Sequence, residues 1–271
     1  MAMSPAERRR RAVRAIQNAR RRRGLQRDEH VERVVGSHAE LQQKIRITLA
    51  GQPSEFDAAH LPALLREVDA HLERWERVAR GEVADALGAA WDLGGEIVDA
   101  PFAAVGTALP GVLLPPHLLD ELVADGVALM DGVGVVARKR IHQALERGLL
   151  GGATPHQVME DITATLKGPG PFRYVTFRAE VVVRTEMGRV QSKAGHRRLE
   201  DAAAVVDGLQ KEWVWSGKTR IKHQAVNGQR RAVSKPFSVG GEELMYPRDP
   251  AGSAANTVMC GCESVPWMDS W

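Results

Sequence analysis

The chain has 271 residues, of which 44% are hydrophobic and 26% charged, the composition of an ordinary globular protein. Its two cysteines, Cys260 and Cys262, exclude a disulfide framework, so we expect a reducing compartment. The charged N-terminus lacks an apolar core, and we therefore expect no secretory signal. Six prolines and glycines interrupt the apolar stretch 100–117, which argues against a membrane anchor.

The net charge of +3 conceals a strongly basic N-terminal segment. Residues 1–34 contain eleven arginines and four acidic residues, a balance of +7 that leaves −4 for the rest of the chain. Because arginine displaces counterions from phosphate, this segment predicts contact with nucleic acid; a solvated helix or an acidic protein partner are the alternatives. The candidate nucleic-acid-binding residues are Arg8, Arg9, Arg10, Arg11, Arg14, Arg20, Arg21, Arg22 and Arg23.

The first half of the chain predicts long helices. Residues 4–50 are expected to be helical, with Gly24 and Gly36 as candidate breaks. Over residues 61–91, apolar side chains recur every three or four positions, which is typical of an amphipathic helix. This stripe and the apolar loop at 100–117 are candidates for a partner-facing surface, although a self-packed bundle would produce the same pattern.

The second half begins with further helices and then changes character. Helical patterns cover 118–149 and about 172–206. Between them, Thr154 and Gln157 form the capping box of a helix that is expected to extend to residue 166. Downstream, residues 213–215 predict a short strand, and glycine and proline turns separate further extended segments.

These patterns predict an α+β protein, in which a long, mostly helical N-terminal region precedes a small mixed C-terminal module with short strands. We expect three segments along the chain: a basic helical arm at 1–50, a helical body at 51–150 and the C-terminal module at 151–271. Beyond the basic arm, the first 150 residues contain no motif that indicates a function.

The C-terminal module contains an ordered series of short motifs. An Arg-Thr-Glu triplet on a helix is followed by a strand that contains tryptophan and by a Thr-Arg-x-x-His segment. Two turns with glycine, a turn with proline and a final Cys-x-Cys motif come next. In this order, the series resembles the phage Mu protein F-like family of head morphogenesis (minor head) proteins, over roughly residues 145–266. The residues that carry the resemblance are Arg184, Thr185, Glu186, Trp213, Thr219, Arg220, His223, Gly240, Gly241, Pro247, Cys260 and Cys262.

The resemblance implies a bacteriophage virion protein that acts in head morphogenesis. It implies a place inside the capsid near the portal vertex, after assembly in the bacterial cytoplasm, with the portal protein and other capsid or scaffold proteins as partners. Some members of such a family travel with the genome during DNA ejection, and contact with phage genomic DNA would suit the basic segment. Two positions depart from the family. Gly261 replaces the usual arginine between the cysteines, and Arg248 replaces the glycine of a frequent Pro-Gly-Asp sequence.

His223, Cys260 and Cys262 are candidate zinc ligands, because thiolate and imidazole are the groups that zinc prefers. The Cys-x-Cys spacing is unlike the usual zinc knuckle, and no fourth ligand is evident. We therefore expect no cofactor and interpret the cysteines as small buried residues at a strand end. For Arg184 and Glu186 we expect structural pairing, in which one of them anchors its helix to the module, rather than catalysis.

Two other functions remain as alternatives. In an ADP-ribosyltransferase-like enzyme, Arg184 would lie on the nicotinamide side of NAD, and Glu242 or Glu243 would be the acid. The sequence lacks the Ser-Thr-Ser strand and Glu-x-Glu spacing of that class, so we expect no enzyme. A DNA-binding module that acts through the arginine-rich arm is the other alternative, and it is compatible with a minor head protein.

Overall fold

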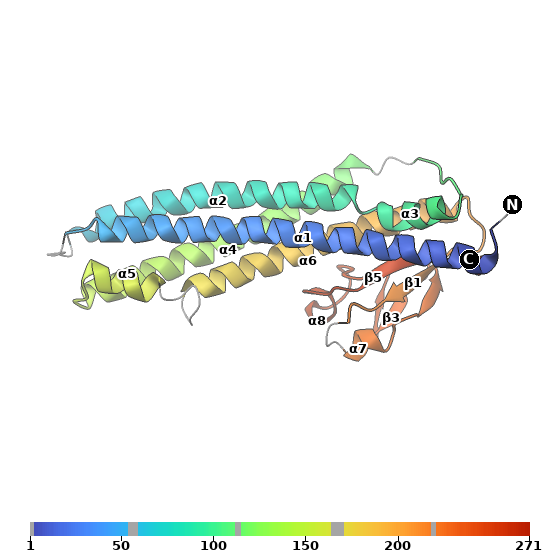
Figure 1. The fold of residues 1–271 in the computed structure, drawn as a ribbon. Coiled ribbons are helices and arrows are strands. Elements are labelled where there is room, and N and C mark those ends of the chain that lie inside the picture. Colours follow the sequence, from blue (N-terminus) through green and yellow to red (C-terminus); the bar gives the residue numbers. More distant parts are fainter. Residues whose placement is uncertain (1–2, 54–58, 112–114, 164–170, 218–220) are drawn as a thin grey trace. The chain divides into compact units, whose positions relative to one another are not determined.

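A computed structural model describes residues 3–53, 59–111, 115–163, 171–217 and 221–271. Long helices come first and short strands gather in the C-terminal part, so the predicted α+β class is confirmed (Figure 1). The elements are α1 (Pro5–Ala50), α2 (Leu61–Asp92), α3 (Glu96–Ala104), α4 (Pro116–Leu150), α5 (Pro155–Thr163), α6 (Pro171–Ala203), β1 (Gln210–Val214), α7 (Ile221–Gln224), β2 (Arg230–Ala232), β3 (Phe237–Val239), β4 (Glu242–Leu244), α8 (Ala254–Thr257) and β5 (Glu263–Trp267).

Within the described residues the long helices are confirmed, and the predictions are wrong in two details. The expected end of the helix after Thr154, at residues 164–166, lies outside the described residues. Helix α1 is continuous through Gly24 and Gly36, because a single glycine in a long packed helix costs only about 1 kcal/mol. The stretch from residue 100 is not simply a loop, because α3 occupies its beginning and includes Pro101. Ile97, Val98 and Phe102 are at most 1% exposed, and their burial outweighs the cost of a proline inside this short helix.

The chain divides into two compact units, and each of them is built from separate stretches of sequence. Unit 1 contains Met1–Glu29, Ala86–Val123 and Arg184–Trp271, and unit 2 contains His30–Asp85 and Ala124–Val183. The three predicted segments do not coincide with these units, since unit 1 takes residues from all three. Each long helix, α1, α2, α4 and α6, contributes residues to both units.

Unit 2 is a helical body whose apolar stripes face inward. Leu64, Val68 and Leu72 of α2 are at most 1% exposed. Trp75 lies edge-on to His38 of α1, with ring centroids 4.4 Å apart. The interpretation of this stripe as a partner-facing surface is therefore wrong, because the body buries the stripe within itself. In the second predicted surface, Phe102 and Val105 are likewise buried, inside unit 1.

Unit 1 contains the β structure. The central strand β1 pairs antiparallel with β2 on one side and with β5 on the other, and β3 and β4 form a separate hairpin. Gly240 and Gly241 make the turn of this hairpin with φ values of 59° and 90°. Positive φ at both central residues of a two-residue turn favours glycine, which explains this pair.

The three-stranded sheet separates two apolar clusters within unit 1. Because neighbouring residues of a strand point to opposite faces, Val214 packs against one cluster and Trp213 belongs to the other. The first cluster is formed with α1, α3 and α6, through side chains such as Ile16 and Phe102. The second cluster is smaller, and its members are Trp213, Val226, Phe237, Val239, Leu244, Cys260 and Cys262, with Trp215 at its margin.

Among the described residues, no helix combines the length and the hydropathy that crossing a membrane requires.

Candidate functional site

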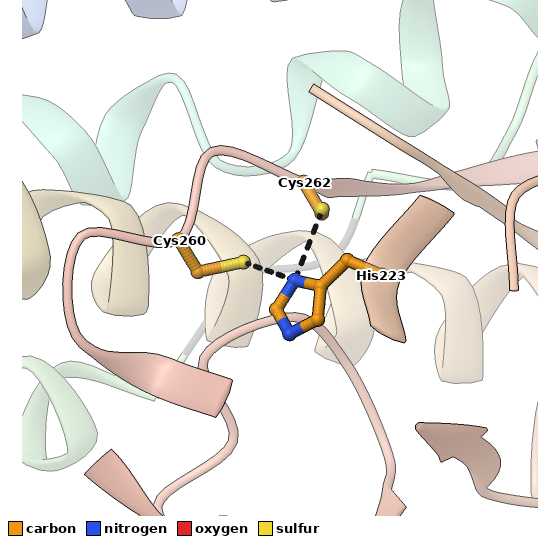
Figure 2. A group of neighbouring side chains, drawn as sticks. All are labelled: His223, Cys260 and Cys262. Carbon is orange, nitrogen blue, oxygen red and sulfur yellow. Dashed lines mark hydrogen bonds between the residues drawn. The ribbon is translucent and has the colours of Figure 1, made fainter. Parts of the chain in front are cut away.

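His223, Cys260 and Cys262 converge at one point in the smaller apolar cluster (Figure 2). His223 lies on α7, and the cysteines lie on the segment that connects α8 to β5. The two sulfurs are 3.4 and 3.5 Å from Nδ1 of His223. The side chains are buried, and both cysteines are free thiols rather than a disulfide. The structure therefore brings the three candidate ligands together and confirms that the cysteines are buried.

The other ring nitrogen of His223 has a defined partner. Its Nε2 lies 3.1 Å from Oδ1 of Asn256, a buried residue of α8. The Asn256 amide nitrogen donates in turn to the carbonyl of Val239, at 3.3 Å, and so orients the amide with its oxygen toward the histidine. Nε2 therefore carries the proton as the donor, and Nδ1 presents its lone pair to the two sulfurs.

The two thiols differ in acidity. The pKa of the Cys260 thiol is lowered, first because its thiolate would accept a hydrogen bond from Cys262 and also because the Arg248 guanidinium lies nearby, against the opposing effect of burial. The pKa of Cys262 is raised, first by the same hydrogen bond to Cys260 and then by burial. This arrangement stabilises a thiolate on Cys260, and thiolates and imidazole are ligands of soft divalent cations.

A buried ionic network lies in the same unit. Glu263, at the start of β5, is 3% exposed and pairs with Arg23 of α1 at 2.7 Å. Arg248 and Arg27 approach the same carboxylate at 3.5 and 3.8 Å. Burial alone would raise the pKa of Glu263, but the three arginines hold it below its usual value. The carboxylate is thus ionised and joins the N-terminal helix to the last strand.

Arg248 connects this network to the cysteine segment. Its guanidinium donates to the carbonyl oxygen of Cys260 and to Oγ of Ser192, the latter at 3.0 Å. The guanidinium also lies against Gly188 of α6, where a Cβ atom would come within 2.6 Å of it. Glycine at position 188 therefore makes the space that the buried arginine occupies.

The Arg-Thr-Glu triplet lies on α6 beside the same segment. Thr185 is buried, and its hydroxyl accepts a hydrogen bond from the backbone of Met259 at 3.1 Å, next to Cys260. Arg184 pairs with Asp28 at 2.6 Å, and the buried Glu186 pairs with Arg189 at 2.8 Å. Arg184 or Glu186 was expected to anchor the helix to the module, and Thr185 between them makes such a contact through Met259.

Two of the remaining motif residues, Trp213 and Pro247, are buried in the interior of unit 1. Trp213 is fully buried, edge-on to His223 at 5.7 Å and to Phe237 at 5.3 Å. Pro247 is buried in the turn that leads to Arg248. Thr219 and Arg220 lie outside the described residues, so their part of the motif has no structural description.

The arginine-rich segment is not a detached arm, which corrects the sequence interpretation. Ala12, Ile16 and Ala19 form a buried face of α1 within the larger apolar cluster, and Arg23, 1% exposed, continues that face. Arg23 is therefore unavailable to nucleic acid. Others already have partners: Arg8 donates to Met3, Arg11 pairs with Glu7, Arg22 pairs with Glu96, and Arg9 stacks on Trp267. Arg20 is half-buried, and Arg10, Arg14 and Arg21 are exposed.

Sequence reasoning did not assign roles to Glu263 and Asn256. A signal for Glu263 exists in α1, because Arg23 follows Ala12, Ile16 and Ala19 at helical spacing, which indicates a buried arginine that needs a carboxylate. Asn256 gave no such signal, since only the fold brings α8 beside His223.

The acidic residues of the enzymatic alternative have different surroundings. Glu242 accepts hydrogen bonds from the backbone and hydroxyl of Ser253, and these bonds lower the pKa of its carboxyl to about 2. Glu243 is exposed on β4, where it stands opposite Ser238. Arg184 lines a cavity of about 260 Å³ together with Arg27, Asp28 and Gly261.

Comparisons with known proteins give two partial relatives. At 29% identity over 141 residues, the chain is similar to the uncharacterized protein YqbB of Bacillus subtilis strain 168, covering 50% of this chain and 45% of that protein. At 30% identity over 90 residues, it is similar to the NAD(+)–arginine ADP-ribosyltransferase EFV of Enterococcus faecalis strain V583, covering 32% of this chain and 18% of the enzyme. The chain thus spans less than half the length of each. No family model and no solved structure matches it.

Proposed function

We propose that this chain is a minor head protein of a tailed bacteriophage that acts in head assembly at the portal vertex inside the capsid. The proposal starts from the ordered series of motifs between residues 184 and 262. The head-assembly function comes from the resemblance of this series to the minor head proteins, and the packing of the motif residues supports the proposal.

The observation that carries the proposal is the mutual contact of these motifs. Thr185 of the triplet accepts a hydrogen bond from Met259 beside the cysteines, and His223 contacts both Trp213 and the two sulfurs. Chance matches scattered along 80 residues would have no reason to share one interior, whereas a motif series that specifies one folded module would do so.

The direct test is association with the portal. The chain, tagged and co-expressed with the portal protein encoded by the same phage genome, is expected to retain the portal during affinity purification. Mass spectrometry of purified heads is expected to detect the chain. Two variants serve as controls. Glu263→Gln is expected to destabilise unit 1 and controls for loss of fold, and Glu96→Gln makes the same charge change at a more exposed ion pair. A chain that neither retains the portal nor enters heads would overturn the proposal.

Contact with the packaged genome is a second part of the proposal, and the exposed arginines support it. Arg10, Arg14 and Arg21 are separated by four and seven residues, so they lie along one face of α1. This face is opposite the buried residues Ala12 and Ile16. Three cations in a row at this spacing suit the phosphates of duplex DNA.

Substitution tests this contact better than deletion, because removing residues 1–34 would also remove the buried face of α1. We expect the triple variant Arg10→Gln, Arg14→Gln, Arg21→Gln to bind duplex DNA more weakly, with the salt slope reduced by up to about 2.7. The matched control changes three exposed arginines of unit 2, Arg46, Arg66 and Arg77, to glutamine. Equal binding by both triple variants would remove DNA contact from the proposal.

A second candidate function rests on the partial match to an ADP-ribosyltransferase. In that case Arg184 and Glu243 would serve NAD, and the chain would hydrolyse NAD or transfer ADP-ribose to arginine. Glu243→Gln should then abolish the activity, whereas Glu212→Gln, a change in a glutamate paired with Arg230, should leave it intact. Absence of activity in the parent chain would eliminate this candidate without affecting head assembly.

A further inference from the structure

We propose that His223, Cys260 and Cys262 bind a zinc ion that cross-links the smaller apolar cluster of unit 1. This inference is independent of head assembly and concerns how the module is held together. The three side chains are 1%, 4% and 1% exposed. Their ligand atoms, one nitrogen and two sulfurs, all lie within 4.8 Å of one another (Figure 2).

The distances agree with a tetrahedral zinc site. Bonds of about 2.3 Å to sulfur and about 2.05 Å to nitrogen place a ligating nitrogen and sulfur about 3.5 Å apart, and two ligating sulfurs about 3.8 Å apart. The sulfurs of Cys260 and Cys262 lie 3.4 and 3.5 Å from Nδ1 of His223. Only small side-chain adjustments would therefore complete the three ligand positions.

The hydrogen-bonding capacity of His223 also favours an ion over two hydrogen bonds. With the Nε2 proton directed at Asn256, Nδ1 has one in-plane lone pair, which can accept one well-aligned hydrogen bond. Two thiols face this single lone pair. A cation placed among the three atoms would bond to all of them at once.

Asn256 is placed to orient the histidine ligand. Ligating histidines almost always donate their second ring N–H to an oxygen, which fixes the tautomer and the ring orientation. The oxygen of Asn256 is in this position, and the amide is itself held by the carbonyl of Val239. The histidine is thus oriented for a ligand before any ion binds.

The charge balance suits a buried site. Two thiolates neutralise one Zn²⁺, so the ion can be buried without a net charge in the apolar cluster. Among the described residues this group has three ligands, which leaves the fourth tetrahedral position to water. The bound ion would tie α7 to the segment before β5, across 37 to 39 residues of sequence.

Cobalt and zinc binding to the full chain provide the test. The reduced, metal-free protein is titrated with Co²⁺ and then with Zn²⁺. We expect one Co²⁺ per chain, with sulfur-to-cobalt charge-transfer and tetrahedral d–d bands that Zn²⁺ abolishes. Because the sequence has two cysteines, the charge-transfer band reports on this pair alone. The Tm is expected to rise with the Zn²⁺ concentration.

Variants identify the ligands. Cys262→Ser and His223→Gln should lose the cobalt bands, and Asn256→Leu should weaken zinc binding about 10- to 100-fold. Asn256→Asp restores an oxygen acceptor and should recover most of the affinity. His196→Gln, which changes another buried histidine of unit 1, is the matched control and should bind as the parent does.

The result on the parent chain decides the proposal whether or not every variant folds. A parent chain that is folded by circular dichroism and binds neither ion would overturn the site. Binding that persists in the double variant Cys260→Ser, Cys262→Ser would place the ion elsewhere and would overturn it equally.

Discussion

Glu263 combines a buried carboxylate with three arginines, and this combination decides how it affects stability. Its ion pair with Arg23 is almost completely removed from water. Arg23 also donates to the backbone carbonyl of Gly94, at 2.6 Å, so its cation is well satisfied. A buried pair contributes little compared with two apolar residues, but removal of one partner leaves the other charge uncompensated.

We therefore expect Glu263→Gln to destabilise unit 1 by about 3–5 kcal/mol. Urea unfolding followed by tryptophan fluorescence measures this change. The control Glu96→Gln removes the more exposed ion pair with Arg22 and should cost no more than about 1 kcal/mol. Equal losses in the two variants would contradict the argument that burial makes the difference.

Arg248 adopts a backbone conformation that is uncommon for residues other than glycine. Its φ is 67°, in the left-handed region that glycine adopts without strain. Its guanidinium donates to the carbonyl of Cys260, beside Gly261, and to the hydroxyl of Ser192.

At the scale of single elements, the start of α5 shows a local signal that the structure reproduces. The backbone N–H of Thr154 donates to the side chain of Gln157 at 2.8 Å, and the backbone N–H of Gln157 donates to the Thr154 hydroxyl at 3.2 Å. This reciprocal pair is the capping box that the sequence predicted, because it depends on residues three apart and on no distant partner.

Thr154→Ala should destabilise unit 2 by about 1 kcal/mol, because one backbone N–H at the helix start loses its acceptor. Thr154→Ser keeps the hydroxyl and should stay within a few tenths of a kcal/mol of the parent. Urea unfolding of the two variants measures the difference. A loss of the same size in the serine variant would assign the effect to the missing methyl group instead.

The packing of α1 against α2 in unit 2 makes this unit sensitive to acid through His38. Burial lowers the pKa of His38 from 6.5 to about 4, and its Nδ1 donates to the carbonyl of Val34 at 3.1 Å. The unfolded chain therefore binds a proton more readily than the folded chain. Stability is fully present above pH 6.5 and is lost as the pH falls toward 4, by up to about 3 kcal/mol.

His38→Gln should remove this part of the pH dependence. Urea unfolding of parent and variant at pH 7, 6, 5 and 4.5 measures it, and the difference between the two curves isolates His38 from His196, whose pKa is also lowered. Parallel curves for parent and variant would show that His38 does not carry the effect.

The sequence predicted the long helices well and the site only in part, for a physical reason. The stripe on α2 repeats locally, so it defines the helix without knowledge of its neighbours. The same locality misled the interpretation of the arginines, because charge along the chain does not reveal that Arg23 faces inward. Three candidate ligands could be named from sequence, but Asn256 and Glu263 acquire their roles only when distant segments meet.

At the scale of the whole chain, each unit depends on segments that are remote in sequence. The larger apolar cluster of unit 1 takes Ile16 from the first helix, Phe102 from the middle of the chain and Val265 from the last strand. The C-terminal module predicted at 151–271 therefore lacks part of its own interior when taken alone.

A fragment of residues 151–271 is accordingly expected to be largely unfolded. It leaves Glu263 without Arg23, and it exposes apolar surface that α1 and α3 cover in the full chain. The amide NMR spectrum measures this directly, with the full chain as the control. A well-dispersed spectrum of the fragment would show that the module folds by itself.

The ion pair between Arg23 and Glu263 joins residues 240 positions apart, and this separation has a consequence for biosynthesis. A ribosome that adds about 5–20 residues per second needs on the order of 10–50 seconds to make the second partner after the first. During that interval the buried face of α1 is already outside the ribosome and has no native cover. The buried face of α1 is therefore expected to need a chaperone's cover until Glu263 has been synthesised.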